Sequence, residues 1–150
     1  MEKITSIRQG VEKLLTIRGR EIPEISLECK QEGEFAHTLI WEGKRIPLFT
    51  TRYDPRIRHI AAYGSRTEEN SALNVYAFTG SDVSLDALMY RELSIAEFIL
   101  HSKAKTITAF VNQNAVNMIV VMENGTNANL DLGNTMAPGS HMQCQHRLIT

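Results

Sequence analysis

Three residues near the start of one predicted helix have side chains suited to binding a polar ligand: Asp86, Tyr90 and Arg91. Asp86 and Tyr90 are four residues apart, so a helix would place them on one face. Their oxygens could hydrogen-bond to the hydroxyl groups of a small sugar or polyol, and they are also the only candidates for catalysis. A second interpretation makes Asp86 a first-turn acid that favours the helix dipole, with Arg91 and Glu92 solvated. The spacing alone leaves both interpretations open.

Basic residues concentrate in one region of the chain, between positions 52 and 66. They are Arg52, Arg56, Arg58, His59 and Arg66. Arginine side chains match the oxygens of phosphate and carboxylate groups, so this region could contact an anionic partner. Asp54, Glu68 and Glu69 lie among these residues and weaken their field. The sequence therefore favours a solvated surface over an anion site.

His141, Cys144 and His146 are residue types that bind zinc, and the last two would share one face of a strand. A structural zinc site normally uses four ligands, and the sequence has no second cluster of Cys and His residues. We therefore predict no metal site. Cys29 has no neighbouring base that could activate it as a nucleophile, so we interpret it as a buried thiol.

The overall composition excludes several classes of partner. The chain has 150 residues, with 16 Lys and Arg against 17 Asp and Glu, and a net charge of -1. A nearly neutral protein has no general attraction to nucleic acid or to an anionic membrane, so we expect neither as a partner. The segment 1–6 has no apolar stretch typical of a secretory signal, and two distant cysteines suit a reducing compartment. We therefore expect a cytoplasmic protein.

No nucleotide-binding motif is present in the sequence. A dinucleotide domain would show Gly-x-Gly-x-x-Gly directly after a strand, and a phosphate-binding loop would show Gly-x-x-x-x-Gly-Lys followed by Ser or Thr. Neither pattern occurs. We therefore predict that this chain binds no cofactor, and that NAD(P) is involved only if a separate Rossmann domain exists.

The elements that must position these residues begin with a predicted helix over residues 2–18. A strand is predicted over 25–30, and a hairpin is predicted from the segments 35–41 and 45–51, with Pro47 indicating an edge strand. Residues 57–63 are rich in apolar and aromatic side chains, and we predict a further strand there.

In the second half of the chain, helices and strands do not alternate regularly, and most of the predicted elements are strands. A helix is predicted over residues 84–101, because its apolar residues recur at helical spacing. The Asn124-Gly125 pair between two apolar runs is a strong hairpin signal. The predicted strands are 73–78, 106–111, 116–122, 126–132 and 142–149.

Together these elements predict a single α+β domain over residues 1–150. We expect a mainly antiparallel sheet with the helix at 84–101 packed on one face and the N-terminal helix beside it. The other face of such a sheet would be uncovered. Because monomers rarely tolerate an exposed apolar sheet face, we expect a homo-oligomer.

The order of motifs over residues 82–134 resembles one known family. Asp86–Tyr90 is followed by Ser94–Leu100, a strand at Lys105–Phe110, a second strand, the Asn124-Gly125 turn and a returning strand. This order is similar to the C-terminal domain of the glucose–fructose oxidoreductase / inositol dehydrogenase / MocA family. The resemblance implies an open sheet with helices on one face, which supplies substrate contacts and the oligomer interface. In that family a separate Rossmann domain binds NAD(P).

One position departs from the family pattern. Where the family carries its catalytic histidine, this chain has Tyr90. A histidine exchanges protons with a sugar hydroxyl near neutral pH more readily than a phenol does. The resemblance therefore implies a substrate-binding and oligomerisation domain that is inactive alone, with a small polyol or sugar as ligand. The alternative is a non-catalytic binding or assembly domain that uses the same scaffold.

Overall fold

The computed structural model describes residues 9–10, 12–13, 16–19, 25–29, 37–41, 43–48, 50–65 and 71–150. The contacts of the chain divide it into two compact units, Met1–Phe49 and Thr50–Thr150, which are described separately. The organisation as one domain stays a prediction.

The unit Met1–Phe49 contains a small antiparallel sheet in the order β1-β2-β3. Its strands are β1 (Ile25–Cys29), β2 (His37–Trp41) and β3 (Lys44–Leu48). The predicted hairpin is confirmed as β2–β3, and Gly43 supplies the positive φ of 75° that its turn requires. Pro47 lies on an edge strand, as predicted. Within the predicted helix 2–18, the residues at 9–10, 12–13 and 16–17 are helical, Arg18 already lies in a turn, and the others lie outside the described residues.

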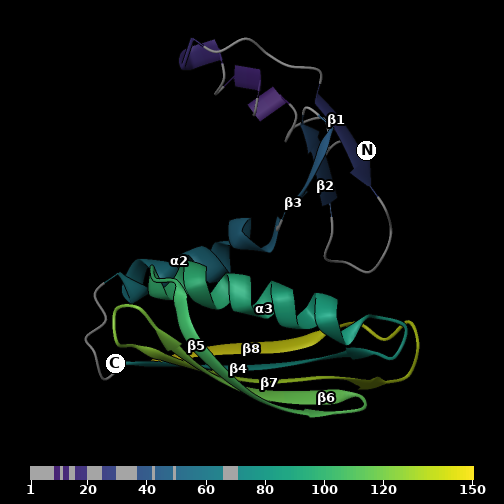
Figure 1. Ribbon diagram of the computed structural model, residues 1–150, viewed down its shortest axis with the longest axis vertical. Coiled ribbons are helices and arrows are strands. Elements are labelled where there is room, and N and C mark those ends of the chain that lie inside the picture. The colour runs from purple at the N-terminus through teal and green to yellow at the C-terminus, as the bar shows by residue number, and fades with distance from the viewer. Residues whose placement is uncertain are drawn as a thin grey trace. The chain divides into compact units, whose positions relative to one another are not determined.

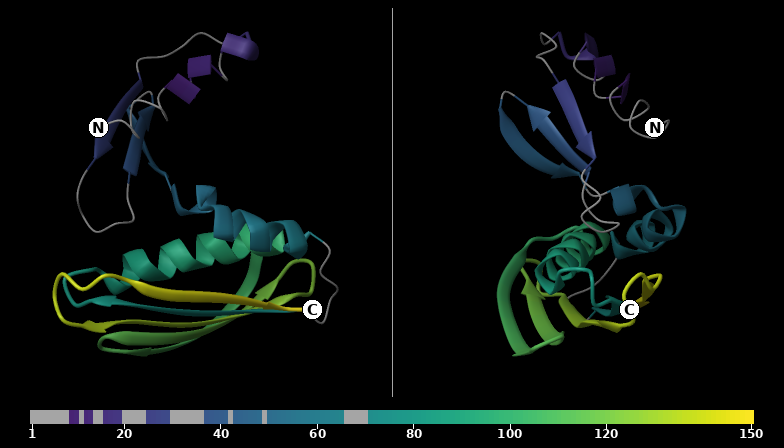
Figure 2. Two further views of the ribbon diagram at one scale, coloured as in Figure 1. Left: turned by 180° about the vertical axis from the view of Figure 1, so that it is seen from behind. Right: turned by 90° about the vertical axis from the view of Figure 1, so that its right-hand side faces the viewer.

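The unit Thr50–Thr150 is a five-stranded sheet with two helices on one face (Figures 1 and 2). Its elements are η1 (Thr50–Tyr53), α2 (Pro55–Gly64), β4 (Ala72–Gly80), α3 (Leu85–Leu100), β5 (Ala104–Asn112), β6 (Ala115–Met122), β7 (Asn127–Met136) and β8 (Gln143–Ile149). The predicted helix at 84–101 is confirmed as α3, and the turn at Asn124-Gly125 connects β6 to β7 with Gly125 at φ 84°.

The prediction of a mainly antiparallel sheet is wrong, because the sheet is mixed. The strand order is β5-β6-β7-β4-β8, and its central pair, β4 and β7, runs parallel. The other three pairs are antiparallel. The reason is chain direction: α3 returns the chain to the starting end of β4, and two hairpins then bring β7 alongside β4 in the same direction.

The core lies between α3 and the central strands. β4, β6 and β7 alternate buried and exposed residues, as strands covered on one face do. The buried face of α3 includes Leu88, Ile95, Ile99 and Leu100, each no more than 1% exposed. Burying each such side chain contributes roughly 1.5–3 kcal/mol, so this contact is a major part of the hydrophobic stabilisation of the unit.

The segment at 57–63, predicted as a strand, is part of helix α2. Asp54 caps the helix by accepting a hydrogen bond from the Arg56 N–H at 2.8 Å, and Pro55 occupies the first turn. Ile57, Ala61 and Gly64 are buried, and their spacing of four and three residues is helical. The expectation of one long helix with an N-terminal helix beside it therefore omitted α2. Among the described residues, the helices are too short or too polar to cross a lipid bilayer.

Candidate functional site

The outer surface of α3 carries the two residues predicted to share one face. Asp86 is exposed in the first turn, and Tyr90, one turn later, is 56% exposed. Ser84 is the N-cap of this helix, without a hydrogen bond from its side chain. The structure therefore places Asp86 and Tyr90 on the accessible side of the helix, where a ligand could reach both.

Arg91 lies on the other side of the helix, in a buried cluster of charged residues. Arg91 is 6% exposed and Glu92 is 0% exposed, so the interpretation of both as solvated groups is wrong. Arg91 Nη1 donates to Glu92 Oε1 and also to the Met142 sulfur at 3.0 Å. His146 Nε2 donates to Glu92 Oε2 at 2.8 Å. This cluster joins α3 to β8 and to the residues that precede it.

His141, Cys144 and His146, whose residue types can bind zinc, do not come together in the structure. His141 and Cys144 are exposed, and Cys144 is a free thiol. His146 instead hydrogen-bonds to Glu92. In the part of the chain that the structure describes, no three residues among His, Cys, Asp and Glu come together in a way that could hold a metal ion. Cys29 lies on β1, in a segment whose side chains are outside the described set.

The basic residues of the region 52–66 have separate environments. Arg56 forms an ion pair with Asp54 at 2.8 Å, and its hydrogen bonds lower the pKa of Asp54 to about 2. Arg58 and His59 are exposed on α2, where the His59 ring contacts Tyr63. Arg66 lies outside the described residues. These residues therefore do not form a single anion-binding patch within the described part of the chain.

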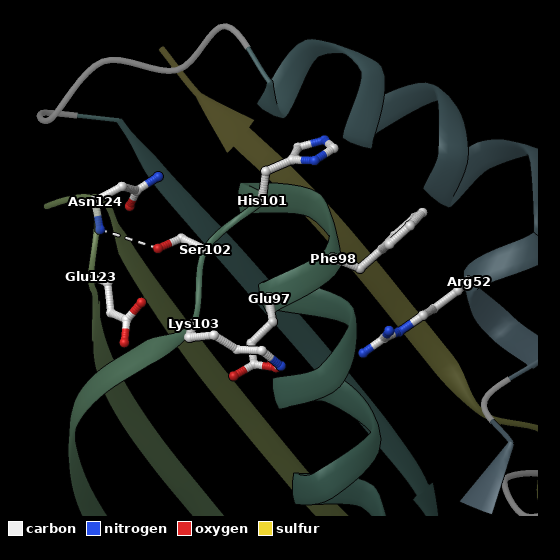
Figure 3. A pocket seen from close by; sticks show the side chains of 8 residues that line it. All are labelled: Arg52, Glu97, Phe98, His101, Ser102, Lys103, Glu123 and Asn124. Atoms are coloured by element: carbon white, nitrogen blue, oxygen red, sulfur yellow. Dashed lines mark hydrogen bonds and ion pairs between the residues drawn. The ribbon is translucent and has the colours of Figure 1, made fainter.

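A pocket of about 600 Å³ lies at the C-terminal end of α3 (Figure 3). Three segments form it: η1, the end of α3 with the residues after it, and the β6–β7 turn. Its lining residues are Arg52, Glu97, Phe98, His101, Ser102, Lys103, Glu123 and Asn124. No local motif in the sequence indicates this pocket, because its residues are up to 72 positions apart in the chain.

The shape of the pocket depends on how α3 ends. His101 adopts a left-handed conformation at φ 49°, and its Nε2 lies 2.9 Å from the Ala61 carbonyl of α2. Asn124 Nδ2 donates to the Leu100 carbonyl, and the Ser102 hydroxyl accepts from the Asn124 N–H (Figure 3). Hydrogen bonds thus satisfy the helix end and hold the β6–β7 turn beside it.

Charged groups in the pocket are largely paired within the protein. Lys103 Nζ contacts Glu97 Oε2 at 2.8 Å. Burial alone would raise the pKa of Glu97, but hydrogen bonds from Lys103 and from the Ala104 N–H outweigh it and hold that pKa below its ordinary value. Arg52 donates to the Ser94 carbonyl at 3.0 Å and lies 5.7 Å from the centre of the Phe98 ring. The pocket therefore offers donors, acceptors and one aromatic ring rather than a net charge.

The turn between β4 and α3 packs closely against the β7–β8 connection. A Cβ added to Gly80 would meet the Asp82 carboxylate and, at 2.9 Å, the Ala137 carbonyl. Asp82 Oδ1 also accepts a hydrogen bond from the Gly139 N–H at 3.0 Å, which ties this turn to the β7–β8 connection.

Comparison with known proteins finds a likeness at the level of the fold. No family model matches this chain, and no curated protein matches it. Among solved structures, the chain is similar to a "probable dehydrogenase" from Thermotoga maritima, with 12% identity and a TM-score of 0.50 over 66% of this chain and 36% of that one. It is also similar to a "putative myo-inositol dehydrogenase" from Sinorhizobium meliloti 1021, with 14% identity and a TM-score of 0.50 over 65% and 37%.

These two likenesses confirm, for the fold, the resemblance predicted from residues 82–134. The chain has the fold of part of a dehydrogenase, and it matches little more than a third of the length of either protein.

Proposed function

We propose that this chain is the substrate-binding and oligomerisation domain of a sugar-type NAD(P)-dependent oxidoreductase, and that it is inactive alone. The observation that carries the proposal is the mixed five-stranded sheet with α3 across one face, a fold that the chain shares with part of two dehydrogenases. The cofactor would bind to a separate Rossmann domain, because this sequence contains no Gly-x-Gly-x-x-Gly motif.

Asp86 and Tyr90 are the residues that we propose contact the substrate. A carboxylate accepts hydrogen bonds from adjacent hydroxyl groups of a polyol, and a phenol donates one. Both side chains lie on the accessible side of α3. We leave Arg91 out of the binding step, because it is buried and donates to Glu92 and Met142.

A thermal-shift screen with polyols, sugars and nicotinamide cofactors tests this proposal. A ligand present at about 100 times its dissociation constant stabilises the folded state by roughly 2.7 kcal/mol, which corresponds to a rise of about 5 °C or more. We expect a cyclic polyol such as myo-inositol to raise the melting temperature, and NAD(P)(H) to leave it unchanged. Stabilisation by a nicotinamide cofactor would contradict the proposed division between two domains.

Matched variants distinguish the outer face of α3 from the pocket. Asp86→Asn removes a carboxylate from the α3 surface, and Glu123→Gln removes one from the pocket lining. We expect Asp86→Asn to abolish the polyol-induced shift and Glu123→Gln to preserve it. If the reverse is observed, the pocket binds the polyol and the assignment to Asp86 and Tyr90 is wrong.

We propose that the sheet face opposite α3 mediates self-association. Tyr76 and Ile119 lie on this face and are 45% and 43% exposed, and Phe110 lies on it at the edge. Large apolar side chains exposed on an uncovered sheet face are candidates for contact with a second copy. The expected readout is a molar mass above that of one chain in light scattering, reduced by Ile119→Lys. A single-chain mass at all concentrations would remove this part of the proposal.

A second candidate function is a non-catalytic binding or assembly domain. The observation that favours it is Tyr90, which stands where the resembling family has its catalytic histidine. The two candidates differ in a Tyr90→His variant studied with a Rossmann partner. Gain of polyol oxidation in that variant would support an altered enzyme domain, and binding of polyol without turnover in both forms would support the binding domain.

A further inference from the structure

Strand β5 is exposed along nearly its whole length. It forms one edge of the five-stranded sheet, and in the described residues only β6 pairs with it. Every residue from Lys105 to Asn112 is exposed. Its large apolar side chains point to both faces: Ile107 is 47% exposed, Phe110 67% and Val111 68%.

This edge lacks the features that normally prevent strands from pairing with other chains. Short length, proline, inward charges and bulges are the usual protections. β5 has nine residues and no proline, and Lys105 is its only charged residue. Its one irregularity lies at the start, between Ala104 and Thr106, so Thr106–Asn112 is a regular strand with an unpaired outer edge within the described structure. By contrast, the opposite edge strand, β8, is held to α3 by the bond from His146 to Glu92.

The regular part of β5 is complementary to itself. Its midpoint is Ala109, and an antiparallel pairing centred there places Ile107 opposite Val111 and Thr108 opposite Phe110 of a second copy. Pairs of two β-branched residues and of an aromatic with a β-branched residue are favourable in antiparallel sheets. The small alanines would meet at the two-fold axis, and Lys105 would lie outside the paired segment, so no like charges face each other.

We propose that two copies of the chain join through their β5 strands, antiparallel and centred on Ala109, so that their sheets continue into each other. The contact is isologous, because each copy uses the same strand. It differs in geometry from the proposed contact through the sheet face opposite α3, and of the residues named for that face only Phe110 belongs to β5. It does not depend on a role in sugar oxidation.

Charge substitutions at the paired positions test the contact and its register. In Ile107→Lys/Val111→Lys, lysines would face each other at two places across the interface. We expect the dissociation constant to rise about tenfold or more, measured by sedimentation or light scattering across a concentration series. In Ile107→Lys/Val111→Glu, each lysine would face a glutamate, and we expect the dissociation constant to stay near that of the wild type.

Ala62→Lys is the control for added charge, because it adds one positive charge to the exposed side of α2 and leaves both β5 and the sheet face opposite α3 unaltered. It should leave the β5 contact intact. All substituted residues are exposed, so equal thermal melting at low protein concentration checks that folding is retained. An unchanged mass in the two-lysine variant, or a monomeric wild type at every concentration, would overturn the proposal. Equal dissociation by the Lys/Glu variant would overturn the register.

Hydrogen exchange provides a second readout. Alternate amides between Thr106 and Asn112 point away from β6 and would bond to the second copy. We expect these amides to be protected in the wild type and to exchange rapidly in Ile107→Lys/Val111→Lys, with β6 amides unchanged. Rapid exchange of the outer amides in the associated wild type would contradict pairing through this edge.

Discussion

Two glutamates on α3, five residues apart, have opposite environments. Glu92 faces the sheet, is 0% exposed, and accepts hydrogen bonds from Arg91 and His146. Glu97 faces the pocket, where its side chain is 19% exposed and pairs with the exposed Lys103. Both are carboxylates on one helix with a cationic partner. The side of α3 on which a glutamate lies therefore determines whether water can replace its cationic partner.

This difference predicts where substitutions are tolerated. Inside the fold, no solvent replaces a lost partner, so a remaining charge stays desolvated. At the pocket, water screens the pair and replaces it when it breaks. Changes at buried contacts of α3 should therefore reduce stability severely, and changes on its accessible side should mainly affect ligand binding.

The largest effect is expected for Glu92→Gln. Arg91 would remain buried beside an uncharged side chain, and breaking a buried ion pair in this way costs about 3–5 kcal/mol of unfolding free energy. Urea denaturation at pH 7 measures this loss. As a control, replacing Arg91, Glu92 and His146 together by Met, Leu and Leu should recover much of the stability, because no uncompensated charge remains. A loss below about 1 kcal/mol in Glu92→Gln would contradict the comparison.

Gly64→Ala tests a buried contact of α3 that involves no charged side chain. Gly64 packs directly against the Ile99 carbonyl of α3, and an added Cβ would overlap with that oxygen. Although alanine is the better helix former, we expect α2 to be displaced and stability to fall by about 1–3 kcal/mol. Urea denaturation provides the measurement, and Ala62→Ser on the exposed side of α2 is the control. Equal stability of Gly64→Ala and the wild type would show that the two helices can move apart freely.

Asp54→Ala tests a capping contact that solvent can reach. Loss of the side-chain bond to the Arg56 N–H should reduce stability by about 1 kcal/mol at pH 7. The pKa of Asp54 is lowered in the fold from 3.8 to about 2, chiefly by the hydrogen bond from the Arg56 side chain. The ionised form thus stabilises the fold above about pH 4, and this contribution is lost as the pH falls to about 2.

The wild type and Asp54→Ala should therefore converge in stability between pH 4 and pH 2, as denaturation at several pH values would reveal. Asp54→Asn keeps a capping oxygen and should retain most of the stability at pH 7 without this pH dependence. A constant difference from pH 7 to pH 2 would exclude the capping role of the carboxylate.

The smallest effect is expected for Glu97→Gln. Its partner Lys103 is exposed and becomes solvated, so the loss should stay below about 1 kcal/mol and shrink further in high salt. A double-mutant cycle with Lys103→Met measures the coupling between the two side chains. A loss as large as that of Glu92→Gln would remove the distinction between the two sides of α3.

Local pattern was sufficient to predict most elements of the unit Thr50–Thr150. The apolar spacing of α3, the alternation of β4, β6 and β7, and the Asn124-Gly125 turn all follow from contacts between residues near each other in sequence. Pattern failed at residues 57–63, where apolar and aromatic residues favoured a strand. Asp54 as N-cap and Pro55 in the first turn start a helix there.

The sequence by itself determined most of the described segments that form helices and strands, and it contains no glycine-rich phosphate loop. Tertiary structure alone decided that β4 and β7 pair in parallel, that Glu92 meets His146, and that η1, α3 and the β6–β7 turn enclose a pocket. The physical reason is range. Periodicity and turn preferences depend on neighbours within a few residues. These contacts instead join distant residues: Glu92 and His146 are 54 positions apart, and the pocket residues span 72 positions. Their partners are chosen by how α3 and the sheet pack together.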